Sequence, residues 1–167
     1  MRDGIIIREI TDQDHEWVRS LLREHWASEV IVTRGRVHHA DLLPGFVALV
    51  EGEKVGLATY CLEHGSCELV SVNALRERQG IGAALVKAVR DAAMAADCNR
   101  VWLITTNDNT PAMRFYEGLG FRRVAVHANA IEESRRLKPE IPKIRYGGTP
   151  ILGEIEYEIT LGASRIP

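Results

Sequence analysis

The sequence predicts one mixed α/β sheet with helices on both faces. Three observations carry this prediction. Strand-like apolar runs alternate with longer stretches of helical periodicity, short turns join the strands of the first half, and helical stretches separate those of the second half. Strands joined by short turns pair antiparallel, whereas parallel pairing needs a longer crossover, usually a helix. The chain of 167 residues, 46% of them hydrophobic, predicts a single domain over residues 1–167.

The first half predicts a strand, a helix and then a meander. Residues 5–10 form an apolar strand-like run, and residues 12–26 carry apolar side chains at one-, three- and four-residue steps, which is typical of a helix with one buried face. Residues 34–43 are polar and irregular and predict a loop. Residues 46–51 and 55–62 predict a hairpin, and residues 67–72 predict the next strand after a turn at 63–65.

The second half predicts helices between strands. Residues 81–97 have one apolar face and predict a helix, and residues 101–106 predict a buried strand. Thr110 is the expected N-cap of the next helix, and Pro111 is its expected first residue because proline lacks the amide that a helix start leaves unpaired. Residues 121–127 and 155–161 predict strands. Within residues 128–153, helical character is confined to 131–137, and the prolines and glycines predict loop elsewhere.

Charge and composition exclude several functional classes. A formal net charge of -2 gives no attraction to nucleic acid or to an anionic membrane. Three cysteines do not indicate a disulfide framework, and Cys61, His64 and Cys67 lack a fourth ligand at a zinc-like spacing, so we expect no metal. The pair His38–His39 has no obvious partner and is expected at the surface. Without a signal peptide or a long apolar span, the chain is expected to be cytoplasmic.

The segment RERQGIGAAL, residues 76–85, carries the strongest functional signal. It joins a predicted strand to a predicted helix, and Gly80 and Gly82 leave backbone N–H groups bare at the positive end of that helix, which suits a phosphate group. A dinucleotide-binding fingerprint would have a third glycine where this chain has Leu85, and a Walker A loop would continue with Gly-Lys-Ser/Thr. The glycine turn alone is therefore a weak signal.

A second motif follows at residues 109–121, which match N-x-x-A-x-x-F-Y-E-x-x-G-F. Together with the glycine turn, in this order and at this spacing, it resembles the GNAT superfamily of acetyl-CoA-dependent N-acetyltransferases. The resemblance runs from residue 67 to about residue 126, and residues 103–109 and 134–142 look like those of a bacterial subgroup without an assigned substrate. It implies transfer of an acetyl group from acetyl-CoA to a primary amine, by direct attack in a ternary complex.

The resemblance also implies how CoA is held. The pantetheine arm is expected along the backbone of the central strand, between two strands that splay apart, and the pyrophosphate on the glycine turn. The expected cofactor-binding residues are Val70, Ser71, Val72, Arg78, Gln79, Gly80, Gly82, Ala83, Asn109 and Tyr116. Glu77 departs from the family, which usually has Arg or Gln at that position. Its carboxylate would repel a pyrophosphate, so we expect it to face solvent or to pair with a basic neighbour.

Two residues are the expected catalytic groups. Tyr116 matches the tyrosine of the family and is expected to protonate the departing thiolate, since a phenol donates without carrying charge. Glu68 is the candidate base, needed because an amine with a pKa of about 10 is almost fully protonated at neutral pH. Many family members carry a glutamate two residues earlier, where this chain has Ser66. Others use ordered water, so a dedicated base stays an open question.

Other functions and the acceptor stay open. Glu77 and Ser66 leave room for a CoA-binding regulatory module that does not catalyse, and the glycine turn alone would fit a nucleotide-binding domain. The acceptor could be a small molecule or a peptide: N-termini, lysine side chains, polyamines, antibiotics and amino acids all fit. Trp26 and His127 are candidates for its pocket. Basic residues that could recognise an acidic acceptor are Arg34, Arg36, Arg135, Arg136 and Lys138. Dimers are common in the family, so a homodimer is a further expectation.

Overall fold

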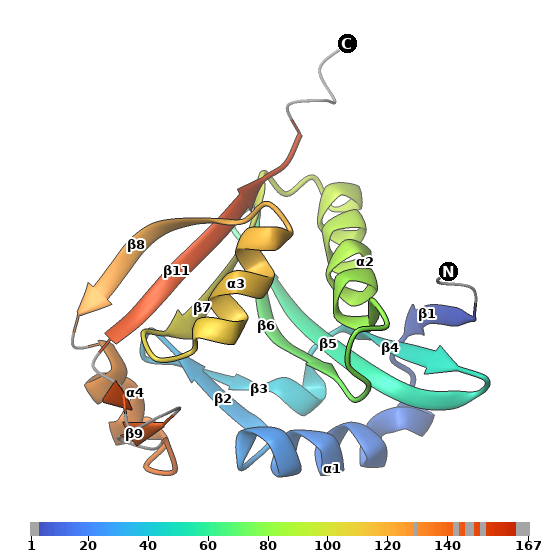
Figure 1. The fold of residues 1–167 in the computed structure, drawn as a ribbon, viewed down its shortest axis with the longest axis horizontal. Coiled ribbons are helices and arrows are strands. Elements are labelled where there is room, and N and C mark those ends of the chain that lie inside the picture. Colours follow the sequence, from blue (N-terminus) through green and yellow to red (C-terminus); the bar gives the residue numbers. More distant parts are fainter. Residues whose placement is uncertain (1–3, 129, 142–143, 146–148, 151–152, 163–167) are drawn as a thin grey trace.

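The computed structural model describes residues 4–128, 130–141, 144–145, 149–150 and 153–162. They contain a seven-stranded sheet with the order β1-β4-β5-β6-β7-β11-β8 (Figure 1). Its strands are β1 (Ile5–Glu9), β4 (Gly45–Val50), β5 (Glu53–Glu63), β6 (Ser66–Ala74), β7 (Arg100–Thr106), β8 (Arg122–Ala128) and β11 (Gly153–Thr160). β6 and β7 pair parallel and the other neighbours pair antiparallel, which confirms the predicted mixed sheet.

Helices cover both faces of this sheet, as predicted. On one face lie α2 (Ile81–Ala95) and α3 (Thr110–Gly118), and on the other lie α1 (His15–Trp26), which a short 3-10 turn η1 (Asp12–Asp14) precedes, and α4 (Ala130–Leu137) (Figure 1). Two apolar clusters follow from this arrangement, one between α2, α3 and the sheet and a smaller one under α1. The sheet therefore separates two apolar clusters, one on each of its faces.

Helix α2 packs directly on the sheet because its apolar residues recur at three- and four-residue steps. Its buried residues are Ile81, Gly82, Leu85, Val86, Val89 and Ala93. Gly56 of β5 permits the close approach: a Cβ added there would lie 2.7 Å from Ile81 Cγ2 and 3.0 Å from both Leu85 Cδ1 and the carbonyl oxygen of Asn73. This contact sets the position of the glycine turn that begins α2 relative to the central strands.

The prediction of an irregular loop over residues 34–43 was wrong. This range contains the turn and the second strand of a hairpin, in which β2 (Val30–Thr33) pairs antiparallel with β3 (Arg36–His39). A short 3-10 turn, η2 (Ala40–Leu42), follows β3. Arg34 and Gly35 both have positive φ, at 50° and 73°, which is the backbone of the two-residue turns that match strand twist. The polar residues of β3 suggested a loop, but the pairing with the β-branched run of β2 decides the structure.

Two smaller differences concern the second half. Asn109, rather than Thr110, is the N-cap of α3: its Oδ1 accepts a hydrogen bond from the Ala112 N–H at 3.3 Å, and Thr110 is the first helical residue. Helix α4 confirms the helical character of residues 131–137. Where loop was predicted, two short strands pair, β9 (Ile144–Arg145) and β10 (Thr149–Pro150), and residues 129, 142–143, 146–148 and 151–152 lie outside the described part.

Candidate active site

The two central strands separate beyond a short paired stretch. β6 and β7 pair only from Ser66–Arg100 to Glu68–Trp102, although β6 continues to Ala74 and β7 to Thr106. We call this opening between β6 and β7 the fork. Residues 70–72, predicted to bind the pantetheine arm, lie on β6 beyond the last paired residue and so at the fork. The expected divergence of the central strands is confirmed.

A bulge in β6 marks the same place. The pairing of β6 with β5 shifts so that Tyr60 faces Leu69 whereas Thr59 faces Ser71, and Val70 is the additional residue. Bulges bend a strand, redirect its side chains and leave backbone groups outside the ladder. Val70 packs in the cluster under α1, whereas Leu69 belongs to the cluster under α2. Backbone groups near Val70 are thus available at the fork.

The glycine turn before α2 presents backbone amides as the sequence predicts. Arg78 and Gly80 have positive φ, at 61° and 78°, and Gly80 is the N-cap without a side-chain hydrogen bond to the helix start. The first intrahelical bond runs from the Ala84 N–H to the Gly80 carbonyl, so the preceding amides of α2 have no partner within the helix. An αL residue next to such amides forms an anion-binding concavity. Gln79 is exposed and Ala83 half-buried at this turn.

The charged residues around this turn are arranged favourably for an anion. Glu77 is exposed, as expected, and Arg76 forms an ion pair with Glu53 of β5 at 2.6 Å. Arg78 is exposed and has no ion-pair or hydrogen-bond partner among the described residues. The guanidinium of Arg78 is therefore free to approach a phosphate group, and the Glu77 carboxylate is not forced toward it.

Tyr116 lies in α3 among aromatic rings. Its ring makes edge contacts with Phe115, at 5.1 Å between centroids, and with Phe121, at 5.7 Å. Burial raises the pKa of its hydroxyl above the ordinary value, so the phenol keeps its proton at neutral pH. Throughout the described part of the chain no residue hydrogen-bonds this hydroxyl. Tyr116 thus has the protonation state and the free donor that an acid needs.

Glu68 lies at the base of the fork, on the face opposite α2. It is the last residue of β6 paired with β7, and its carboxylate is 2% exposed. The Thr33 hydroxyl donates a hydrogen bond to Oε2 at 2.7 Å, and Nε2 of His38 lies 3.1 Å from Oε1. The hairpin β2–β3 supplies both partners. The carboxylate is held by residues that the sequence did not associate with it.

His38 corrects an expectation of the sequence. Its side chain is 5% exposed and faces β6, whereas His39 is exposed as predicted. Side chains alternate along a strand, so one member of the pair must point inward once these residues form β3. The signal was the β-branched run 30–33 before a two-residue turn, which indicates a hairpin and hence an inward position for alternate residues of β3.

Comparison with known proteins places this geometry in a family. The family model "Acetyltransferase (GNAT) family" matches residues 7–121, more than half of the chain. The chain belongs to the GNAT acetyltransferase family. It is therefore an acyltransferase by class, and its recognition from the glycine turn and the motif at residues 109–121 is confirmed.

Bacterial relatives match most of this GNAT chain. The uncharacterized protein YdhI of Bacillus subtilis is 41% identical over 133 residues, which cover 79% of this chain and 83% of that protein. The uncharacterized protein YxbD of the same organism is 35% identical over 139 residues, covering 83% and 87%. Human N-alpha-acetyltransferase 30 is 35% identical over 85 residues, but these cover 47% of this chain and 24% of that protein.

Solved structures share the fold at low identity. A GNAT acetyltransferase from Elizabethkingia anophelis with acetyl-CoA bound superposes with a TM-score of 0.69 at 18% identity, covering 95% of this chain and 99% of that one. The ribosomal-protein-S18-alanine N-acetyltransferase of Escherichia coli superposes with a TM-score of 0.66 at 15% identity, covering 98% and 99%. These likenesses confirm the fold of the GNAT protein described here.

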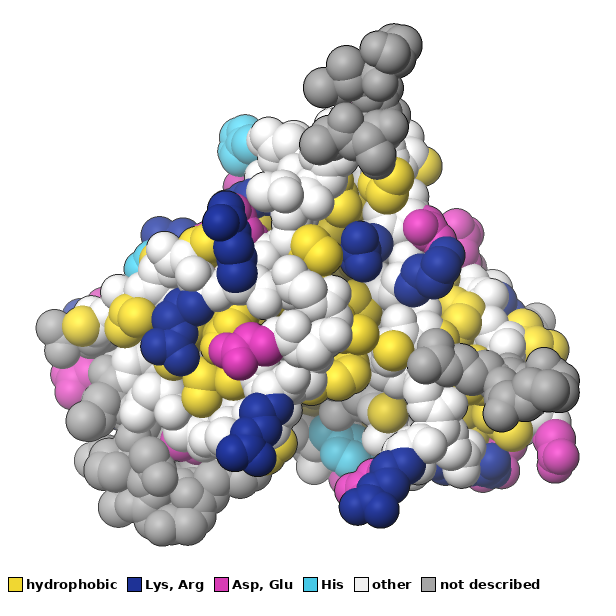
Figure 2. Space-filling view, turned by 45° about the horizontal axis from the view of Figure 1, so that its top comes forward, with side chains coloured by type: hydrophobic (Ala, Val, Ile, Leu, Met, Phe, Trp, Pro, Cys, Tyr) yellow, Lys and Arg dark blue, Asp and Glu magenta, His cyan; other side chains and the backbone are white. Residues whose placement is uncertain are grey.

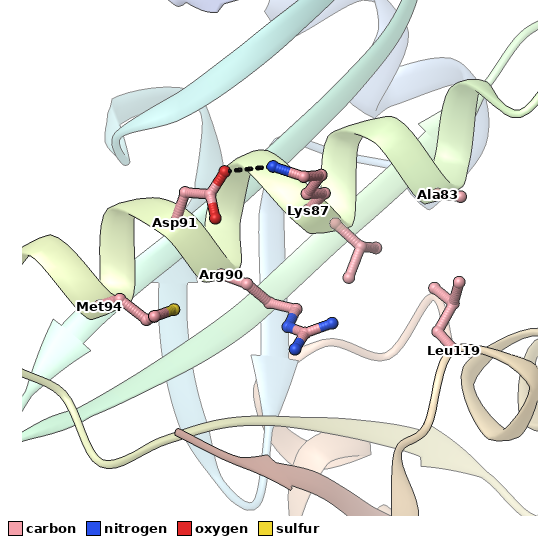
Figure 3. A pocket seen from close by; sticks show the side chains of 7 residues that line it. Ala83, Lys87, Arg90, Asp91, Met94 and Leu119 are labelled. Carbon is pink, nitrogen blue, oxygen red and sulfur yellow. Dashed lines mark hydrogen bonds and ion pairs between the residues drawn. The ribbon is translucent and has the colours of Figure 1, made fainter. Parts of the chain in front are cut away.

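A cavity runs along α2 from the glycine turn of this GNAT protein. Its volume is about 320 Å³, and the lining residues are Ala83, Val86, Lys87, Arg90, Asp91, Met94 and Leu119 (Figure 3). Lys87 pairs with Asp91 at 2.8 Å, whereas the Arg90 guanidinium extends toward Leu119 at the end of α3 (Figure 3). Sequence reasoning missed Arg90, because which face of α2 stays uncovered depends on where α3 packs. Figure 2 shows hydrophobic side chains along the middle of one face with Lys and Arg on both sides.

All five basic residues that the sequence offered for an acidic acceptor are already engaged. Arg36 pairs with Glu63 at 2.7 Å, and Arg34 Nη1 lies 3.4 Å from Glu156. The buried Lys138 donates to the carbonyl oxygens of Trp26 and Val30, both at 2.6 Å. The other two are in α4, where Arg136 pairs with Glu133 and Arg135 also has a partner. The two pocket candidates are likewise bonded, Trp26 to Asn73 at 2.8 Å and His127 to Glu156 at 3.0 Å.

Two features are absent from the described residues. These residues contain no group of three or more His, Cys, Asp or Glu side chains that could hold a metal ion. No helix among them is long and apolar enough to cross a membrane. Cys67 is buried in the cluster under α2, and burial raises the pKa of its thiol to about 12, so it is a poor thiolate nucleophile.

Proposed function

We propose that this protein transfers an acetyl group from acetyl-CoA to a primary amine by direct attack in a ternary complex. The observation that carries this proposal is the fork, because β6 and β7 stop pairing at Glu68–Trp102 although both strands continue. A thioester between the strands would meet backbone groups of β6, and Glu68 lies at the base of the same opening on the face away from α2. Donor and acceptor can thus approach from opposite faces of the sheet.

The donor side of the proposal uses the predicted cofactor residues. The amides that follow Gly80, together with Arg78, would take the pyrophosphate, since bare amides at a helix start favour anions. The backbone of residues 70–72 would bond the pantetheine arm. Asn109 caps α3 with its Oδ1, which leaves its amide NH₂ free to donate to that arm. Arg90 faces the cavity along α2 and would pair with a phosphate of the nucleotide portion.

The chemical step needs two proton transfers. Glu68 takes one proton from the acceptor ammonium, and the neutral nitrogen attacks the thioester carbonyl carbon. As the C–N bond forms, a backbone N–H at the fork stabilises the oxyanion. The C–S bond then breaks, Tyr116 protonates the thiolate sulfur, and the nitrogen loses its second proton as the amide forms. Tyr116 recovers its proton from that step or from solvent, so protons balance over a turnover.

An acceptor screen with thiol release as readout tests this function. Acetyl-CoA is offered with peptides bearing free N-termini, lysine-containing peptides blocked at the N-terminus, polyamines, amino acids and aminoglycosides. We expect one class to release thiol above the rate without acceptor and to gain one acetyl group by mass spectrometry. Peptide N-termini come first, since human N-alpha-acetyltransferase 30 is 35% identical over 85 residues. Tight acetyl-CoA binding without any turnover would instead support the regulatory module.

Three further expectations stay predictions. They are a single domain over residues 1–167, a cytoplasmic location and a homodimer. Size-exclusion chromatography with light scattering reports the oligomeric state directly.

A further inference from the structure

A buried polar cluster lies where the hairpin β2–β3 packs against β6. Its members are Thr33, His38 and Glu68, which are 7%, 5% and 2% exposed. Each can form hydrogen bonds, and buried polar groups are costly unless they are paired. Because Glu68 is the last paired residue before the fork, this cluster adjoins the opening where the proposed reaction takes place.

The cation paired with Glu68 lies at the limit of ion-pair distance. Arg36 Nη1 lies 4.0 Å from Oε1, and the same guanidinium pairs with Glu63 at 2.7 Å. On the neighbouring strands, Cys61 of β5 faces Glu68 in the register, and Arg100 of β7 bonds to Glu156 and Glu158 instead. The carboxylate therefore depends on Thr33 and His38 for its surroundings.

Counting hydrogens in this cluster determines the tautomer of His38. The Thr33 hydroxyl has a single proton and donates it to Glu68 Oε2 at 2.7 Å. The same hydroxyl oxygen lies 3.2 Å from His38 Nε2, so in that contact it can only accept. His38 must then carry a proton on Nε2. With the proton on Nδ1 alone, Nε2 would compete for the Thr33 hydroxyl, and Glu68 would lose its aligned donor in a buried site.

One oxygen of Glu68 is left able to accept a proton. Oε2 is tied to Thr33, whereas no described donor is aligned for a hydrogen bond to Oε1, although His38 Nε2 is only 3.1 Å away. A buried carboxylate oxygen without an aligned donor is rare and calls for an explanation. The anchored Oε2 fixes the direction of Oε1, which is itself buried and is the oxygen left to accept a proton.

We propose that His38 and Thr33 are positioning residues that hold Glu68 as the general base. His38 donates to Thr33, Thr33 donates to Oε2, and Oε1 receives the proton of the acceptor ammonium through a relaying water, because Oε1 itself is buried. The ammonium N–H bond breaks, an O–H bond forms on Oε1, and the resulting carboxylic acid returns the proton to solvent after turnover. This inference rests on the proposed function, in which Glu68 is the base.

Steady-state kinetics with two small probes test the inference. Ethylamine is protonated at neutral pH and needs a base, whereas hydroxylamine is largely neutral and does not. For Thr33→Val we expect kcat with ethylamine to fall about tenfold or more, a part of the roughly 100- to 10,000-fold that a positioned acid or base contributes, and kcat with hydroxylamine to stay within about twofold. Thr33→Ser, which keeps the hydroxyl, is expected to restore most of the activity with ethylamine.

Matched histidine variants distinguish a loss of the hydrogen bond from His38 to Thr33 from a loss of side-chain packing. His38→Leu is expected to behave like Thr33→Val, and His38→Gln to retain more activity because its amide can still donate to Thr33. His39→Leu is the control, since His39 is the next residue of β3 and is exposed. Thermal denaturation of each variant shows that it is folded. An equal loss with both probes, or no loss for Thr33→Val, would overturn the inference.

Nitrogen-15 NMR of the His38 ring gives a readout that needs no acceptor. We expect a proton on Nε2 in the free protein at neutral pH. A His38 with a bare Nε2 would overturn the inference whatever the kinetics. Failure of the wild-type protein with every amine counts against the proposed function instead, and full activity of Glu68→Gln counts against the base assignment. The positioning role of His38 and Thr33 is thus tested separately from the acetyl transfer itself.

Discussion

The polar groups of Tyr116 and Asp14 differ in whether the fold depends on them. The Tyr116 hydroxyl makes no hydrogen bond to any residue that the structure describes, although its ring packs against Phe115 and Phe121. The ring therefore stabilises the fold, and the hydroxyl is free for another task. Asp14 is the opposite case, because its carboxylate is fully used by neighbouring groups.

Tyr116→Phe should separate activity from stability. We expect kcat to fall by about 100-fold, the scale of a lost general acid, with little change in the free energy of unfolding, because the removed hydroxyl has no partner in the described part of the chain. Thiol release against pH and thermal denaturation measure the two effects. An unchanged kcat at every pH would show that Tyr116 is not the acid.

Asp14 forms the best-paired charged group near the N-terminus. It is 1% exposed, Arg8 bonds to both of its oxygens at 2.7 and 2.9 Å, and Lys54 lies at 2.8 Å. The Thr11 N–H also donates to it at 2.8 Å. The bond from Arg8, followed by those from Lys54 and Thr11, lowers the pKa of the Asp14 carboxyl well below its ordinary value, against the effect of burial.

Asp14→Asn should destabilise the protein in a pH-dependent way. Since the folded-state pKa is lowered, the ionised carboxylate contributes stability above the unfolded pKa of about 3.9 and loses it as pH falls below that value. We expect a loss of about 2 kcal/mol at pH 7, reduced from the cost of a fully buried pair because Arg8 and Lys54 are partly exposed. Urea unfolding at pH 7 and near pH 3 measures it. A difference that did not shrink at low pH would contradict this account.

At the scale of elements, the hairpin β2–β3 is clamped from both ends. The Arg34 N–H at its turn donates to Glu154 Oε1 of β11 at 2.7 Å, and Ser134 of α4 donates to Oε2 of the same carboxylate at 2.8 Å. Lys138, which follows α4, donates to the last carbonyl of α1 at Trp26 and to Val30. Two segments distant in sequence, β11 and the end of α4, thus hold the hairpin that carries Thr33 and His38.

Lys138→Met should loosen this clamp without touching the fork. The change keeps the aliphatic stem but removes two donors from buried carbonyls, which costs about 1–3 kcal/mol. Hydrogen exchange should rise in α4 and at residues 26–30 more than in the central strands. Arg136→Met is the control, since Arg136 is exposed and, among the described residues, pairs with Glu133 of the same helix alone. Equal exchange in the two variants would show that Lys138 is not a clamp.

At the scale of the whole molecule, the two faces of the sheet carry different parts of the proposed site. α2 and α3, with the glycine turn and the cavity, lie on one face, and the hairpin with α1 and α4 lies on the other (Figure 1). The fork connects the two faces where β6 and β7 part. A donor bound on the first face would therefore contact β6, β7, α2 and α3 together, and its binding should stabilise the entire fold.

Acetyl-CoA should raise the melting temperature of the protein, and part of that rise should depend on the pantetheine arm. A ligand at 100 times its Kd adds about 2.7 kcal/mol to the free energy of unfolding, or about 5–10 °C for a chain of this size. ADP lacks the arm and should give a clearly smaller shift. Gly82→Ala should reduce the acetyl-CoA shift, because the new Cβ would lie 3.0 Å from Phe115 Cζ and push α3 from the first turn of α2. An equal shift with ADP would favour the nucleotide-binding alternative.

Much of the fold could be predicted because most elements carry their own signal. The strands of the meander, the amphipathic helix α2 and the glycine turn are set by local periodicity and by glycine backbone geometry. The hairpin β2–β3 could not be read in the same way, since its second strand is polar and the hairpin is stabilised by the pairing of β2 with β3 and by contacts with β6 and β11. Helix α3 shows the same limit at one residue, because Asn109 rather than Thr110 reaches the Ala112 amide.

The sequence by itself determined the family, the glycine turn and the identity of Tyr116 and Glu68 as candidates, since these depend on residue types at short spacings. Only the tertiary structure decided the surroundings of Glu68. Thr33 is separated from it by 35 positions, and His38 by nearly as many, yet strand pairing and the packing of the hairpin bring all three into one buried cluster. Local patterns encode backbone shape, whereas the partners of a buried carboxylate follow from contacts between distant segments.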